Sequence, residues 1–135
     1  MRYLAIDPGT KRTGLAVGDD ETKIAGPIGV IETSNPEERL RQIGLAIASH
    51  NPHELVVGLP INMDGTEGPA ARQAHVLAEQ LTSRFGLGVH LVDERLTSEA
   101  ANVQLDQRDL TRKGRRARID ALAAATFLQD FLNSR

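Results

Sequence analysis

Three short apolar runs crowd into the first 31 residues, and their spacing limits the fold more than any other feature of the chain. They are Tyr3 to Asp7, Gly14 to Gly18 and Pro27 to Ile31, and a Pro8-Gly9 turn follows the first run. Runs this close together leave no room for the crossover helix that parallel neighbours require. The spacing therefore predicts three strands in an antiparallel meander.

After Ile31 the pattern changes to helices that alternate with strands. Asn35-Pro36-Glu37-Glu38 marks a helix start, because proline is favoured at the first helical position and acids in the first turn. The predicted elements are a helix through His50, a strand over Glu54–Gly58, a loop over Leu59–Gly68, a helix from Pro69 to about Phe85, a strand over Val89–Val92, a helix from Thr97 or Ser98 through Leu105, and a last helix from about Ile119 to Leu132.

Short apolar strands joined through helices indicate parallel strands with right-handed crossovers. The expected fold class is therefore α/β, with a mixed five-stranded sheet flanked by helices. In that sheet the antiparallel three-strand meander continues into parallel strands. A chain of 135 residues is long enough to bury about two-thirds of its unfolded surface, so we expect residues 1–135 to form a single domain.

Composition excludes several classes of site and location. Without cysteine the chain has no disulfide, no thiolate zinc site and no thiol nucleophile. No apolar run approaches the length that spans a membrane, and the N-terminus does not resemble a secretory signal. We therefore expect a cytoplasmic protein with no membrane partner.

The net charge of −2 hides a strongly basic segment between Arg108 and Arg118. Its six basic residues and one acid, Asp109, give this segment a net charge of +5 and leave −7 for the rest of the chain. The six are Arg108, Arg112, Lys113, Arg115, Arg116 and Arg118. A solvated loop would explain such a charge run equally well. With Gly114 inside it, we interpret the segment as a mobile arm that becomes ordered on a nucleic-acid backbone.

Three acidic residues fall where the ends of strands or helices meet. Asp7 closes the first strand, Glu94 follows the fifth, and Asp120 is predicted to open the last helix, on an apolar face with Ala124 and Phe127. Asp93 competes with Glu94, since adjacent strand residues point to opposite faces. A helix cap or a salt bridge would explain any one of these acids. Three that converge beyond the carboxyl ends of parallel strands suggest a metal-dependent phosphodiesterase.

Four ordered motifs carry a family resemblance over almost the whole chain. They are Ala5–Gly14, Val56–Pro60 together with Asn62–Pro69, Asp93–Thr97, and Ile119–Ala124. The chain resembles the YqgF/RuvX family of RNase H-like proteins, known as pre-16S rRNA nucleases and Holliday-junction resolvases. The resemblance implies an RNase H-like sheet, with Asp7, Glu94 and Asp120 as catalytic and metal-binding acids.

Carboxylate oxygens are hard ligands, so Mg²⁺ or Mn²⁺ is the expected cofactor, with two ions in the site. Asp7 is our candidate for the bridging ligand, with Glu94 and Asp120 on either side. Lys11 and Arg12 are predicted to contact a nucleic-acid phosphate, and Arg95 is predicted to hold either the substrate or the Glu94 carboxylate in place. Asn62 and Thr66 are given a secondary binding role, although Asp64-Gly65 between them also fits a plain turn.

The leading functional hypothesis is a divalent-metal-dependent endonuclease that hydrolyses phosphodiesters in structured RNA or branched DNA. The first choice of reaction is processing of the 5′ end of pre-16S rRNA. The alternative is resolution of four-way DNA junctions, which requires two symmetry-related active sites and hence a homodimer. A non-catalytic nucleic-acid-binding scaffold is a further alternative. An actin-like phosphotransferase is disfavoured, because one domain of 135 residues lacks the second domain that encloses the nucleotide.

Overall fold

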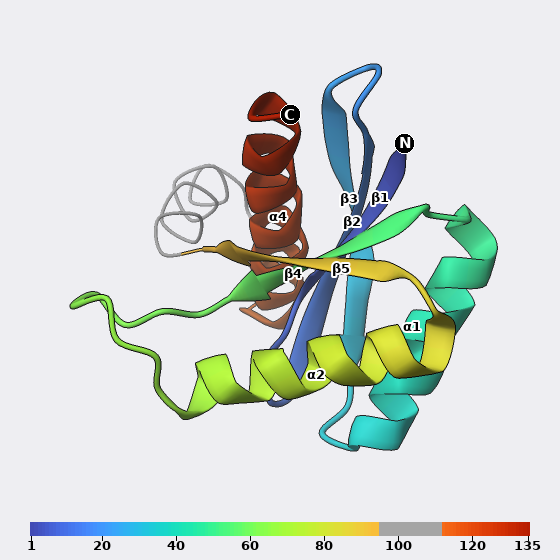
Figure 1. The fold of residues 1–135 in the computed structure, drawn as a ribbon. Coiled ribbons are helices and arrows are strands. Elements are labelled where there is room, and N and C mark those ends of the chain that lie inside the picture. Colours follow the sequence, from blue (N-terminus) through green and yellow to red (C-terminus); the bar gives the residue numbers. More distant parts are fainter. Residues whose placement is uncertain (95–111) are drawn as a thin grey trace.

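The computed structural model describes residues 1–94 and 112–135, and in the second segment it describes side chains from Ala121 onward. Figure 1 shows a sheet with helices on both faces. The described elements, in chain order, are β1 (Arg2–Asp7), β2 (Arg12–Asp19), β3 (Ile24–Glu32), α1 (Pro36–His50), β4 (Glu54–Leu59), α2 (Pro69–Phe85), β5 (Gly88–Asp93) and α4 (Arg112–Asn133). The helix predicted to run through Leu105 lies outside the described residues.

The five strands form one mixed sheet in the order β3-β2-β1-β4-β5. β2 pairs antiparallel with both β1 and β3, whereas β4 pairs parallel with both β1 and β5. This confirms the predicted sheet, a three-strand meander that continues into parallel strands. The carboxyl ends of β1, β4 and β5 consequently share one edge, where ligands of α/β proteins commonly bind.

Strands β2 and β3 are longer than predicted, because their hairpin extends beyond the apolar residues. Pairing begins at Asp19 and Ile24, next to the turn. The turn is closed by a 2.9 Å hydrogen bond from the Lys23 N–H to the Asp19 carbonyl oxygen, and Lys23 itself has a φ of 59°. The apolar pattern of the sequence does not predict this backbone pairing, so it did not predict the full length of the two strands.

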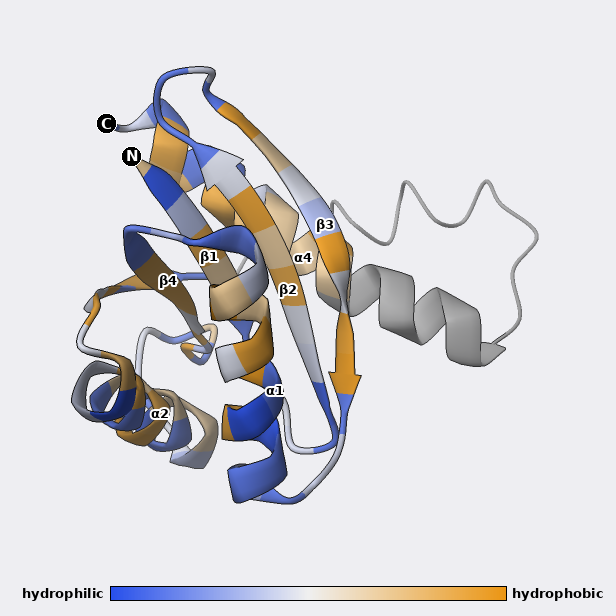
Figure 2. Ribbon diagram, turned by 90° about the vertical axis from the view of Figure 1, so that its right-hand side faces the viewer, coloured by the Kyte–Doolittle hydropathy of each residue, from blue (hydrophilic) through white to orange (hydrophobic). Residues whose placement is uncertain are grey.

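Strand alternation divides the core into two layers. On one face, side chains of β1, β2 and β4 pack against α1 and α2: Leu4, Ile6, Leu15, Leu55 and Val57 against Leu40, Ile43, Ala74, Leu77 and Leu81. On the other face the sheet packs against α4: Tyr3, Ala5, Ala16 and Val56 against Ala124, Ala125, Phe127, Leu128 and Leu132. Figure 2 shows α1 and α4 on opposite sides of β2.

Local signals explain where α1 and α2 begin and end. The Asn35 side chain accepts hydrogen bonds from the backbone N–H groups of Glu37 at 2.9 Å and Glu38 at 3.3 Å, which caps α1. Asn51 ends α1 in the left-handed conformation, and Gly86 ends α2 in the same way. Both helices therefore match their predicted bounds.

Helix α4 begins at Arg112 instead of near Ile119, so the expected start of the last helix was wrong. Residues 112–118 of the basic segment belong to this helix and do not form an irregular arm. Arginine, lysine and alanine are good helix formers, and Gly114 alone costs only about 1 kcal/mol. Asp120 consequently lies within α4 and does not open it.

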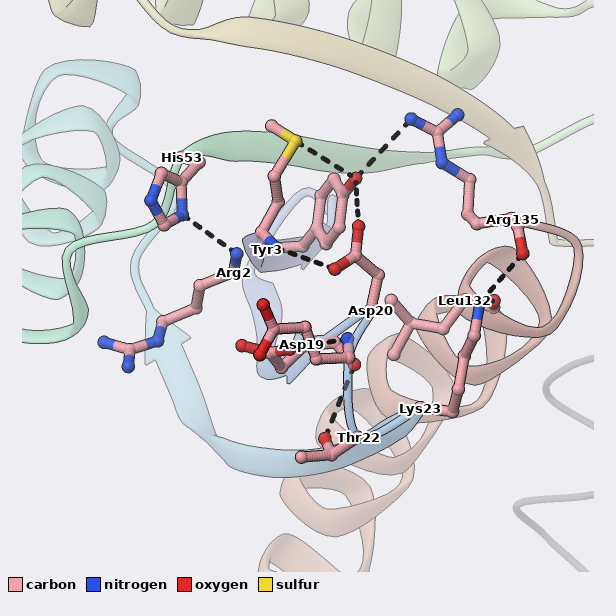
Figure 3. A network of polar contacts seen from close by, with 11 residues as sticks. Arg2, Tyr3, Asp19, Asp20, Thr22, Lys23, His53, Leu132 and Arg135 are labelled. Carbon is pink, nitrogen blue, oxygen red and sulfur yellow. Dashed lines mark hydrogen bonds and ion pairs between the residues drawn. The ribbon is translucent and has the colours of Figure 1, made fainter.

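The chain ends meet at the edge of the sheet opposite to the carboxyl end of β1. The N-terminal ammonium group donates to Asp20 Oδ1 at 2.7 Å, and the Tyr3 hydroxyl group donates to Asp20 Oδ2 at 3.5 Å. Lys23 Nζ donates to the backbone oxygens of Leu132 and Arg135. Figure 3 shows how these contacts tie β1 and the β2–β3 turn to the end of α4.

Within the described residues, no helix combines the length and the apolar character needed to cross a membrane.

Candidate active site

Asp7 and Glu94 both lie at the sheet edge formed by the carboxyl ends of the parallel strands. Asp7 is the last residue of β1, and Glu94 follows the last residue of β5. Strand β4 runs between these two strands. The register pairs Ile6 with Val57 and Gly58 with Val92, so Gly58 of β4 follows the partner of Ile6 and lies level with Val92, two residues before Glu94.

Alternation along the strands directs both acids to the face that α4 covers. Tyr3 and Ala5 belong to the core layer under α4, and Asp7 is the next residue in that series. Val92 packs against the same layer, and Glu94 is two residues further along. Asp7 is half-buried, and so is Glu94.

The Glu94 side chain reaches sideways from β5 and lies over Gly58 of β4. A Cβ atom added to Gly58 would overlap Glu94 Oε2, and it would lie 3.0 Å from Glu94 Cδ and 2.9 Å from Phe127 Cε2. Glu94 Oε2 is buried. The carboxylate therefore occupies a niche bounded by the backbone of β4 and the ring of Phe127.

Asp93 and Glu94 lie in different surroundings, as alternation along a strand requires. Asp93 is exposed and is paired in the sheet with Leu59, whereas Glu94 is half-buried against Gly58. Of the two neighbours, Glu94 is the one on the α4 face, the face to which alternation also directs Asp7.

The turn after Asp7 is held from two sides. A Cβ atom on Gly9 would overlap the carbonyl oxygen of Arg12, so the turn is too tight for any other residue. From α1, Arg39 Nη1 donates a 2.8 Å hydrogen bond to the Gly9 carbonyl oxygen. Arg39 also lines a cavity of about 50 Å³ beneath the turn, together with Thr10 and Gln73. Lys11 is exposed at the tip of this turn, and Arg12 begins β2.

The loop after β4 is a small, internally bonded hairpin. Ile61 bridges to Glu67, and the Asn62 N–H donates to the Thr66 carbonyl oxygen at 2.9 Å. Asn62 Nδ2 donates to Thr66 Oγ1 at 3.1 Å, and Thr66 Oγ1 in turn donates to Asp64 Oδ1 at 2.6 Å. Hydrogen bonds from the Thr66 hydroxyl and N–H groups hold the pKa of Asp64 below its usual value. Asn62 and Thr66 are exposed, but the Asn62 side-chain amide and the Thr66 hydroxyl group make hydrogen bonds within the loop.

Sequence comparison identifies the family. The model of the RuvX family, described as Holliday junction resolvase, matches residues 1–134. A relative from Anaeromyxobacter sp. (strain Fw109-5), named "Putative pre-16S rRNA nuclease", is 41% identical over all of this chain and 98% of its own length. A relative of the same name from Opitutus terrae is 41% identical over all of this chain and 93% of its own length.

This chain belongs to the RuvX family. Solved structures agree with its fold: RuvC of Thermus thermophilus, in complex with a Holliday junction substrate, has a TM-score of 0.53 at 19% identity, over all of this chain and 95% of RuvC. Fowlpox virus resolvase, in complex with Holliday junction DNA, has a TM-score of 0.56 at 12% identity, over 99% and 98% of the two chains. At such identities the likeness establishes the RNase H-like fold alone.

The acids of this RuvX-family chain suit a divalent cation. Carboxylate oxygens are the donors that Mg²⁺ and Mn²⁺ prefer, and the niche over Gly58, which a Cβ would fill, holds one carboxylate on the face expected for Asp7. Among the described side chains, no group of three or more His, Asp or Glu residues forms a metal site. The side chain of Asp120 is not among those described.

Several residues of this RuvX-family chain that are predicted to contact nucleic acid have side chains that the structure does not describe. Arg95 and Arg108 lie in the segment that is not described. Helix α4 includes Arg112, Lys113, Arg115, Arg116 and Arg118, whose side chains are not described either. Their roles, like those of Lys11, Arg12, Asn62 and Thr66, stay predictions.

Sequence reasoning missed Gly58 and Arg39. Gly58 did stand in the Val56–Pro60 motif, yet nothing in that motif shows which residue of another strand needs the space. No sequence pattern marks Arg39, because its contact with Gly9 joins residues 30 positions apart.

Proposed function

We propose that this protein is a divalent-metal-dependent endonuclease that hydrolyses phosphodiester bonds in structured nucleic acid. The observation that carries the proposal is the position of Glu94. Its carboxylate extends from β5 over Gly58 of β4, the strand that separates it from β1 and Asp7. Two acids from strands that are not neighbours thereby approach one edge of the sheet, as ligands of a shared cation require.

Asp120 is the third proposed ligand, because of its position along α4. Ala124 and Phe127, four and seven residues later, are both buried against the sheet. Residues at these intervals share one stripe of a helix. Phe127 lies beside the Gly58 niche, so this stripe passes over the proposed site.

Asp7, Glu94 and Asp120 would hold Mg²⁺ or Mn²⁺, with Asp7 as the ligand common to two ions. When bound, two such ions supply activation of a water molecule and stabilisation of the leaving oxygen in phosphodiester hydrolysis. The protein contributes a rigid edge, since Gly9 and Arg39 hold the turn after Asp7. No protein nucleophile is needed for this reaction.

Basic side chains would bind the nucleic-acid backbone around the site. Lys11, Arg12 and Arg95 follow the two strand-end acids in the sequence, and Asn62 and Thr66 stand on the loop after β4. The basic residues of α4, from Arg112 to Arg118, precede Asp120 on the same helix. Contacts of this kind determine where the backbone lies but do not read a base sequence.

Processing of pre-16S rRNA, at its 5′ end, is the preferred reaction, because two relatives that are 41% identical along the whole chain are named "Putative pre-16S rRNA nuclease". Junction resolution is the second candidate, favoured by the description of the matching family. It requires two active sites related by symmetry, which a homodimer would provide.

Cleavage assays with a precursor rRNA fragment and a four-way DNA junction, each with Mg²⁺, Mn²⁺ or EDTA, test the proposal. We expect cleavage of the RNA that EDTA abolishes. Preferential cutting of the junction would instead assign the second reaction. Binding of both nucleic acids without cutting either would favour a non-catalytic scaffold.

A further inference from the structure

We propose that Gly58 is a positioning residue of the cation site, because its missing side chain is the space that the Glu94 carboxylate occupies. This inference rests on the proposed function. It adds to the cation site a residue that does not itself coordinate the cation. Its basis is the niche over β4, where a Cβ atom would overlap Glu94 Oε2 and approach Cδ to 3.0 Å.

The conformation of the backbone does not explain the glycine. Positive φ values occur at Gly29, Gly65 and Gly86, but Gly58 is not among these residues. It lies inside β4 and pairs in regular register with Val92 of β5. Because glycine weakens the interior of a strand, its presence here calls for a reason based on space.

The niche also fixes the direction of Glu94. Phe127, only 2% exposed, closes it from α4 at 2.9 Å from the position of the added Cβ. Between the β4 backbone and this ring, the carboxylate is confined to the space over β4. Any larger residue at position 58 must displace either Glu94 or Phe127, since packed cores do not absorb an added methyl group without shifts.

The niche has an electrostatic consequence for a bound cation. Glu94 Oε2 is buried, and attraction between opposite charges strengthens as the local dielectric constant falls. A Glu94 side chain displaced toward water would lose both its direction and this advantage. Gly58 should therefore affect cation affinity more than it affects the fold.

Gly18 provides a matched control on the same face of the sheet. A Cβ atom there would lie 2.9 Å from Leu132 Cδ1 and 3.1 Å from Leu128 Cδ2, both on α4, and 3.0 Å from the carbonyl oxygen of Ile24 on β3. Gly18→Ala therefore disturbs the packing of α4 as Gly58→Ala does, but it displaces no carboxylate. Differences between these two variants separate positioning from packing.

The test is calorimetric titration of Mn²⁺ into wild type, Gly58→Ala, Gly18→Ala and Gly58→Ala/Phe127→Leu, with thermal unfolding of each. The double variant relieves the contact with the ring, so it keeps the test valid if Gly58→Ala unfolds. We expect at least a tenfold loss of Mn²⁺ affinity in both Gly58 variants, and wild-type affinity with a lower Tm in Gly18→Ala.

Wild-type affinity in a folded Gly58 variant would overturn the positioning role. An equal loss in Gly18→Ala would also overturn it, because general repacking would then explain the effect. If wild type itself binds no Mn²⁺ the proposed metal-dependent function fails, an outcome distinct from failure of the Gly58 inference.

Discussion

Arg39 on α1 donates a 2.8 Å hydrogen bond to the carbonyl oxygen of Gly9, two residues after Asp7. The contact joins the α1 layer to the turn that leads away from the proposed metal ligand. Because Gly9 has no room for a side chain, the hydrogen bond and the tight turn together fix the direction in which the chain leaves β1.

Arg39→Ala should therefore loosen the turn after Asp7. A hydrogen bond from a charged group contributes about 1.5 to 3 kcal/mol, so we expect a lower Tm together with weaker Mn²⁺ binding. Arg72→Ala, which removes an exposed arginine from α2, is the control and should change neither. Wild-type cation affinity in Arg39→Ala would limit Arg39 to a role in stability.

Substitution of the neighbours Asp93 and Glu94 distinguishes the ligand from its competitor. Glu94→Gln keeps the shape of the side chain but removes its charge, so Mn²⁺ affinity should fall at least tenfold, or about 1.4 kcal/mol. Asp93→Asn should leave the affinity within about twofold, because Asp93 is exposed. Calorimetric titration measures both. The reverse order of effects would assign Asp93 as the ligand.

The fold was largely predictable because its determinants are local in the sequence. Spacing of the apolar runs predicts the meander, and Asn35-Pro36 and Gly86 mark helix ends that the structure confirms. The start of α4 was not predictable from charge, since a basic run suits either a solvated loop or a helix of arginine and lysine.

The proposed site was predictable in part. Asp7 and Glu94 could be assigned to strand ends, because one apolar run stops at Asp7 and another stops at Val92, two residues before Glu94. The niche at Gly58 could not, because it depends on the register of β4 with β5 and on the contact with Phe127 from α4. Such relationships arise between elements that are distant in sequence, and the hydrophobic periodicity of one element does not indicate its contacts with another.

Arg115→Ala combined with Arg116→Ala tests the basic part of α4. If both side chains contact phosphates, nucleic-acid binding should weaken, and the slope of log affinity against log salt should flatten by roughly 1.4 to 1.8. Mn²⁺ affinity should not change. Filter binding from low to moderate salt measures the slope, with Arg72→Ala as the control. An unchanged slope would remove these residues from the binding surface.

The pH dependence of stability should report the contact between Asp20 and the N-terminus. A hydrogen bond from the N-terminal ammonium group lowers the pKa of Asp20 from 3.8, and the same contact raises the pKa of the ammonium group from 8.0. Stability from the pair is thus present between these values. It is lost as pH falls through the lowered pKa of Asp20 or rises through the raised pKa of the ammonium group.

Asp20→Asn should consequently lower Tm near pH 6 and have little effect well below pH 3.8. Thermal unfolding from acid to neutral pH measures the difference, with Glu21→Gln next to it as the control. A difference between Asp20→Asn and wild type that stays constant across this range would exclude the ion pair as its cause.

The most direct measurement compares wild type with Asp7→Asn in cleavage of a precursor rRNA fragment and a four-way DNA junction, with Mn²⁺, Mg²⁺ or EDTA. Asp19→Asn, at the far end of β2, is the matched control. We expect metal-dependent cleavage by wild type and Asp19→Asn, and a loss of at least a hundredfold (about 2.7 kcal/mol) in Asp7→Asn while nucleic-acid binding persists. Equal cleavage by Asp7→Asn and wild type would contradict an active site built on the acid at the end of β1.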